Sequence, residues 1–185
     1  MKKGNLKLIG IVAASIVAVV VLCVFLAQSF QNKAYRLEEN VTTAKADVTL
    51  QEKRRAELIP NLVDCVKAYD EHEYKTLMDA IAARGTNSDE SAAEIQTMIK
   101  AVAEAYPELK SNENYNKLMT ELMTTENMIL SYRENYNNQI NTYKKYVRQF
   151  PTRPILNMLG YEVQSYKLLD YGDTYSEAPT NLFED

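Results

Sequence analysis

The sequence predicts an all-α protein, in which an N-terminal transmembrane helix precedes an elongated up-and-down bundle of about four helices. Only five glycines and five prolines interrupt 185 residues, and strong helix formers such as Ala, Leu, Glu and Lys are abundant. The chain shows neither sustained apolar–polar alternation nor an Asn-Gly or Asp-Gly turn, so strand signals are nearly absent. Apolar residues also recur at steps of three, four or seven, which is the spacing of an amphipathic helix.

We assign residues 1–30 to an N-terminal tail and membrane anchor, and residues 31–185 to the bundle domain. Twenty residues without a charge run from Leu8 to Ala27. A helix of about twenty residues spans roughly 30 Å, the hydrocarbon thickness of a bilayer. A cleaved signal peptide is the alternative, but its apolar region is usually about 7–15 residues long. We therefore predict an uncleaved signal-anchor.

The orientation of the anchor follows from the basic residues near its ends. Lys2, Lys3 and Lys7 precede the span, whereas the basic residues that follow it are diluted by acids. The tighter cluster favours a cytoplasmic N-terminus and an extracytoplasmic bundle domain.

Charge and cysteine content exclude several kinds of site. Beyond residue 30 the chain carries 18 basic and 25 acidic side chains, a net charge of −7, which argues against nucleic-acid binding. Cys23 and Cys65 are isolated, so they indicate neither a disulfide framework nor a metal site. His72-Glu73 lacks the second histidine that a zinc-protease motif needs, since position 76 is Thr76. We expect no metal and no cofactor.

A long first helix is predicted from Lys33 to Arg84, with Pro60 inside it. A proline within a helix costs roughly 3 kcal/mol, because it removes one backbone hydrogen bond and clashes with the preceding turn. The apolar phase nevertheless continues across Pro60, so we predict a kinked helix there. The alternative is a boundary, with Ile59 closing one helix and Pro60 opening the next. The predicted inward positions are Leu37, Val41, Ala44, Val48, Ile59, Leu62, Val66, Tyr69, Leu77 and Ile81.

Two further helices follow the first one in the predicted bundle. Gly85 is expected to cap the first helix, and Asn87 with Glu90 fits a capping box for a helix over residues 88–105. Tyr106-Pro107 ends that helix, and a second long helix of about 38 residues follows and stops at Pro151. The predicted inward residues of the last helix are Tyr115, Leu118, Leu122, Ile129, Tyr136, Ile140, Tyr143, Val147 and Phe150.

Polar residues interrupt both long apolar stripes, at Arg55 in the first helix and at Glu126 in the second. We predict that Arg54 or Arg55 pairs with Glu126 in a buried polar layer, and that Asn61 lies near the carbonyl that Pro60 leaves without a donor. We favour a structural network that fixes helix register over a binding site. The candidate residues for either role are Arg54, Arg55, Glu57, Asn61, Glu126, Arg133, Tyr136 and Asn137.

The motifs around the proline resemble those of a known family. They are Arg54-Arg55-Ala56-Glu57-Leu58-Ile59-Pro60-Asn61-Leu62-Val63, Tyr106-Pro107-Glu108-Leu109-Lys110 and Phe150-Pro151. With them the sequence resembles the LemA family of bacterial membrane-anchored proteins, from about Glu39 to the C-terminus. The resemblance implies a short N-terminus, one membrane span and an elongated helical bundle, but no known catalytic activity. It also implies envelope or membrane proteins as partners.

Three functions are compatible with these patterns. The first is a non-enzymatic envelope protein, a helical scaffold or adaptor with coiled-coil-like stripes that also favour a homo-oligomer. The second is a ligand- or signal-sensing bundle that uses the polar layer, because arginine binds carboxylates and phosphates in a bidentate manner. The third, an enzyme, lacks a pair of carboxylates at a defined spacing, a Ser-His-Asp set and a phosphate loop. We favour the first.

Overall fold

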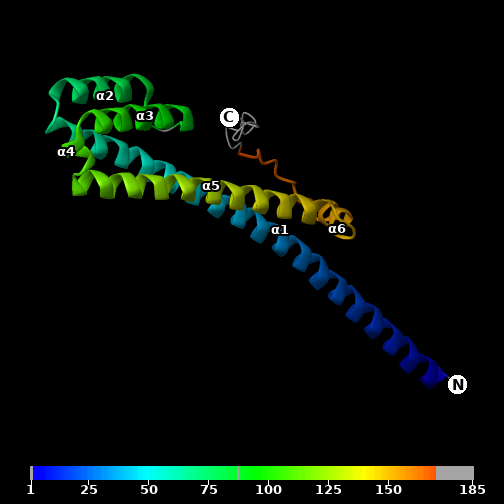
Figure 1. Ribbon diagram of the computed structural model, residues 1–185. Helices are drawn as coiled ribbons and strands as arrows, with labels where there is room; N and C mark the ends of the chain where they lie inside the picture. The colour runs from blue at the N-terminus through cyan, green and yellow to red at the C-terminus, as the bar shows by residue number, and fades with distance from the viewer. Residues whose placement is uncertain (1, 87, 170–185) are drawn as a thin grey trace, which may run out of the picture. The chain divides into compact units, whose positions relative to one another are not determined.

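The computed structural model describes residues 2–86 and 88–169, and these residues form helices without any strand (Figure 1). The predicted all-α class is confirmed. The helices are α1 (Lys2–Lys67), α2 (Glu71–Arg84), α3 (Asp89–Ala105), α4 (Pro107–Lys110), α5 (Glu113–Arg148) and α6 (Thr152–Met158).

The chain divides into two compact units, and α1 and α5 each contribute a segment to both. Of the described residues, unit 1 comprises 2–43 and 138–168, and unit 2 comprises 44–86, 88–137 and 169. In each unit the α1 and α5 segments run antiparallel. In unit 1, Tyr146 bonds to Phe30 and the later Glu38 bonds to the earlier Tyr143.

Helix α1 continues through Pro60 without a boundary, as the unbroken apolar phase predicted. Ile59, Leu62 and Val66 are completely buried on the face that the stripe predicted. These side chains belong to the core of unit 2, which also includes residues of α2, α3 and α5. Burial of apolar area, at about 25 cal/mol per Å², offsets the backbone cost of the proline.

The prediction that the first helix extends to Arg84 is wrong, because α1 ends at Lys67 and α2 begins at Glu71. Asp70 adopts an extended conformation, and its carboxylate accepts hydrogen bonds from the backbone N–H groups of His72 (2.8 Å) and Glu73 (3.0 Å). An aspartate in this position starts a new helix by satisfying its free donors. The hydroxyl of Tyr106 donates to the other Asp70 oxygen and fixes the cap.

Gly85 caps α2 as predicted, with φ of 72° and its N–H donating to the carbonyl of Ile81 at 2.8 Å. A side chain at this φ would be strained, which explains glycine here. The predicted capping box is wrong: Ser88 is the N-cap of α3, and its hydroxyl accepts from the N–H of Ser91 at 3.1 Å. Asn87 itself lies outside the described residues.

Helix α5 has 36 residues, close to the predicted length, and buries most of its predicted stripe. Leu118 is half-buried, and Phe150 is exposed, since its side chain is 88% accessible. The helix ends at Arg148, so the helical phase no longer determines the direction of residue 150. A short helix, α6, follows at the end of α5 (Figure 1).

Candidate functional site

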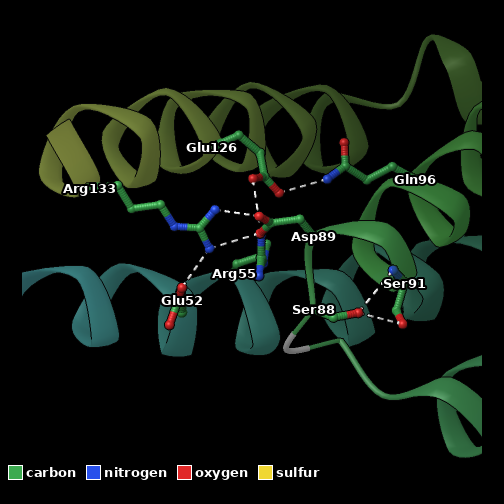
Figure 2. Close-up of polar contacts among 8 residues, drawn as sticks. All are labelled: Glu52, Arg55, Ser88, Asp89, Ser91, Gln96, Glu126 and Arg133. Atoms are coloured by element: carbon green, nitrogen blue, oxygen red, sulfur yellow. Dashed lines mark hydrogen bonds and ion pairs between the residues drawn. The ribbon is translucent and has the colours of Figure 1, made fainter. Parts of the chain in front are cut away.

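The buried polar layer of unit 2 is built around two arginines from different helices (Figure 2). Arg55 of α1 is completely buried, and one of its terminal nitrogens lies 2.7 Å from Asp89 and 3.3 Å from Glu126. Arg133 of α5 is also buried, donates twice to Asp89 and lies 2.7 Å from Glu52. The layer therefore joins α1, α3 and α5 through charge-assisted hydrogen bonds.

Asp89 is the centre of this network, since it pairs with both arginines. Its position as the first residue of α3 ties the start of that helix to α1 and α5. Burial would raise the pKa of the Asp89 carboxyl, but the hydrogen bonds from Arg133 and Arg55 outweigh burial and hold the pKa below its usual value. The same bond to Asp89 raises the pKa of Arg133. Both groups therefore stay ionised at neutral pH.

The second carboxylate of the layer, Glu126, also has two hydrogen-bond partners. Glu126 of α5 bonds to Arg55 through one oxygen, and its other oxygen accepts from the Gln96 amide at 2.9 Å (Figure 2). Two arginines thus face three carboxylates, and each carboxylate has an arginine within 3.3 Å. Every charged group of the layer is thus paired with an opposite charge inside the layer, which favours a structural role in helix register.

Three of the predicted residues lie outside the layer. Arg54 is exposed and pairs with Glu121, while Glu57 and Asn61 are also exposed. The prediction that Asn61 lies in a buried layer is therefore wrong. On a helix, consecutive residues point about 100° apart, so only Arg55 of the two arginines faces the core.

Arg54, Glu57 and Asn61 instead line one groove of about 410 Å³ on unit 2. Leu50, Gln51, Lys53, Leu58 and Glu121 complete its lining. The groove thus presents charges of both signs beside apolar side chains.

The last two predicted residues, Tyr136 and Asn137, lie on α5 away from these ion pairs. Tyr136 is buried, and burial raises the pKa of its hydroxyl. The Asn137 amide makes two hydrogen bonds with the backbone of Leu169, at 2.8 and 3.0 Å. It therefore fixes the end of the described chain within unit 2.

Sequence reasoning missed Asp89, Glu52 and Gln96 as members of the layer. In the sequence, Asp89 looks like an ordinary acidic residue in the first turn of a helix, where a solvent-exposed carboxylate interacts favourably with the helix dipole. Glu52 precedes Arg55 by three residues in the polar gap of the first stripe, but the helical pattern does not single it out as a partner. The presence of a second candidate arginine, Arg133, beside the single candidate partner Glu126 was the available signal that more than one carboxylate was needed.

A second polar cluster, in unit 1, was also missed. Tyr143 and Tyr161 are both buried, their hydroxyl oxygens lie 3.0 Å apart, and both donate to Glu38 of α1. The Tyr143 hydroxyl accepts from the backbone N–H of Gln164 at 2.8 Å. The cluster therefore holds the segment after α6 against α1 and α5. Burial, followed by the bond to Glu38, raises the pKa of Tyr161.

No group of three or more His, Cys, Asp or Glu side chains suited to a metal ion occurs in the described part of the chain. The described residues do include one helix long and apolar enough to cross a membrane, which is α1. Its most apolar 18-residue window has a mean hydropathy of 3.0.

A comparison with known protein families supports the resemblance that the motifs around Pro60 indicated. The LemA family matches residues 44–180, which is most of the chain and includes every residue of the polar layer. No curated protein was found to match. Because the family match covers far more than half of the sequence, the chain belongs to the LemA family.

Proposed function

We propose that this protein is a single-pass, membrane-anchored protein of the bacterial envelope that acts as a non-enzymatic helical scaffold or adaptor for other envelope proteins. The observation that carries the proposal is the exposure of the apolar segment of α1. Its most apolar window is 0% buried within the described structure. A core helix of a soluble protein would be covered by its neighbours, whereas an exposed apolar helix of this length matches a bilayer.

The continuity of α1 supports the adaptor role. One helix of 66 residues contains the apolar segment and then enters the cores of both units. No loop interrupts α1 between the apolar segment and the residues that pack in the units. The polar layer uses its charges internally, which suits a scaffold of fixed helix register.

Photocrosslinking in intact cells tests the proposal. A photoreactive residue would replace Leu50 or Met123, which are exposed apolar positions of unit 2 at 62% and 55%. We expect distinct crosslinks to membrane or envelope proteins, or to a second copy of the chain. The matched control places the same group at Ile59, which is buried and cannot reach a partner. Crosslinks no different from those of the Ile59 control would contradict the adaptor role.

The orientation proposal, with the bundle outside the cytoplasm, is tested separately. Protease added to intact cells or spheroplasts should digest the bundle domain. Protection of the bundle until the membrane is lysed would place it in the cytoplasm.

The groove beside Arg54 favours a second candidate function, a ligand-sensing bundle. Its site would be the groove and not the buried layer, because the groove is open and lined by Lys53 and Arg54. A thermal-shift screen with carboxylate and phosphate compounds tests it. Arg54→Ala should abolish any stabilisation by the compound while the protein stays folded, and an unchanged shift would exclude this site.

A further inference from the structure

The end of unit 1 where α5 meets α6 lies level with the end of the apolar segment. The Tyr146 hydroxyl donates to the carbonyl of Phe30 at 3.0 Å, and the Lys33 ammonium lies 4.9 Å from the centre of the Tyr146 ring. The apolar segment ends at Ala27, only three residues or about 4.5 Å of helix before Phe30. Since the two helices run antiparallel, the chain beyond Tyr146 approaches the segment that would enter the bilayer.

Two large apolar side chains are exposed at this corner. Phe150, just after α5, is 88% exposed, and Met158, the last residue of α6, is 76% exposed. Among the described residues after Ala27, these are the two most exposed large hydrophobic side chains. Exposed apolar side chains next to a membrane anchor are stabilised when they enter the interfacial region of the bilayer.

Two arginines accompany these apolar side chains. Arg148 and Arg153 line a groove of about 490 Å³ together with Val147, Asn157 and Val163. Among the described residues, neither arginine makes an ion pair. A guanidinium group matches the geometry of a phosphate oxygen pair. Basic residues close to a membrane surface are attracted to anionic lipids.

We propose that this corner, defined as Arg148, Phe150, Arg153 and Met158, is a second membrane contact of the protein. Phe150 and Met158 insert into the interface, and Arg148 and Arg153 bind the phosphates of anionic lipid headgroups. The contact fixes the tilt of unit 1 on the bilayer, which a single helix does not do. The inference rests on the proposed anchoring by α1 and adds a defined lipid-binding surface to it.

Single tryptophans test the proposal, because the natural chain contains none. The full-length protein would be placed in lipid nanodiscs with brominated acyl chains, which quench a tryptophan that reaches the bilayer. Phe150→Trp should be quenched, with blue-shifted emission. Val20→Trp, within the apolar segment, reports insertion of the anchor. Leu50→Trp, which is 62% exposed in unit 2, should remain unquenched.

The pattern of quenching separates the two proposals. Quenching at position 20 without quenching at position 150 would overturn the second contact and leave the anchor intact. No quenching at position 20 would overturn the anchor and the contact together. Equal quenching at positions 50 and 150 would show general adsorption, which also contradicts a defined corner.

A charge test addresses the arginines. In the Phe150→Trp background, brominated phosphatidylglycerol should quench more strongly than brominated phosphatidylcholine. Arg148→Gln with Arg153→Gln should reduce that ratio to about one. The control pair Lys100→Gln and Lys117→Gln, at exposed positions of unit 2, should leave the ratio unchanged. A ratio unaffected by the arginine changes, or equally affected by the control pair, would exclude headgroup binding at the corner.

Discussion

Replacing Arg55 by leucine should destabilise the protein far more than the same replacement of its neighbour Arg54. Arg55 is completely buried and holds two carboxylates, Asp89 and Glu126, whose side chains are 40% and 30% exposed. Removing one partner of a fully buried ion pair costs about 3–5 kcal/mol. Because water can partly solvate the two carboxylates, we expect a smaller cost of about 2–3 kcal/mol.

Arg54 provides the matched control for this prediction. It makes one ion pair, with Glu121, and the two side chains are 54% and 34% exposed. Surface ion pairs of this kind contribute about 0–1 kcal/mol. The two variants differ by one position on the same helix and carry the same substitution, so helix propensity and net charge are equal in both.

Thermal unfolding in detergent, followed by circular dichroism, measures the difference. For a protein of this size, 1 kcal/mol shifts Tm by about 2–4 °C. Arg55→Leu should therefore lower Tm by roughly 4–12 °C, and Arg54→Leu by less than about 4 °C. Equal shifts in the two variants would refute the conclusion that the layer fixes the position of α1. A stabilised Arg55→Leu variant would do so as well.

Three further predictions concern Asp89, Glu38 and Pro60. Because the pKa of Asp89 is lowered in the folded state, its ionised form stabilises the fold at pH values above the pKa of an unfolded aspartate. That stabilisation should be lost as pH falls through the folded pKa of Asp89. Asp89→Asn should therefore make the free energy of unfolding less dependent on pH in the acid range. Glu38→Gln weakens the acceptor of two tyrosine hydroxyls, so hydrogen exchange after α6 should accelerate; unchanged exchange would show that Glu38 does not hold the segment. Pro60→Ala gives residue 60 a backbone N–H that can donate to the carbonyl of Ala56. The free energy of unfolding should therefore rise by up to about 3 kcal/mol, and Tm should rise with it. A lower Tm would mean that α1 depends on the proline.

The raised pKa values of the unit 1 tyrosines predict the alkaline behaviour. Burial and the bond to Glu38 keep Tyr161 neutral, so its contribution to stability is complete below the pKa of an unfolded tyrosine, about 10. That contribution is lost as pH rises through the folded pKa. Glu38→Gln should therefore unfold at a different alkaline midpoint from the natural protein, whereas a coincident midpoint would contradict the coupling.

Periodicity was enough to predict most of the fold, because apolar burial determines helix phase over long stretches. The stripe from Val41 to Val66 kept its phase through Pro60, and the structure keeps one helix there. The break near Asp70 was missed because it depends on a single capping side chain, which Tyr106 holds from a distant part of the chain. Local sequence carries no information about that contact.

The polar layer was only partly predictable, for a related reason. The pairing of Arg55 with Glu126 follows from two gaps at matching levels of two stripes. Asp89 enters the layer through the path of the loop before α3, which no helical pattern specifies. Glu38 and Tyr161 meet through a segment without regular structure, so periodicity cannot pair them either. Sequence thus identified Arg55, Arg133 and Glu126 on the long helices. It missed Glu52 of α1 and the partners that α3 supplies, Asp89 and Gln96.

Extraction of cell membranes with alkaline carbonate tests the central claim of an uncleaved anchor most directly. Peripheral and soluble proteins are released by this treatment, whereas a protein held by a transmembrane helix stays in the pellet. We predict that the protein remains in the pellet at its full mass, 21.1 kDa, and that deletion of Leu8 to Ala27 releases it. Release of the natural protein, or a mature form beginning near Ser29, would contradict the anchor.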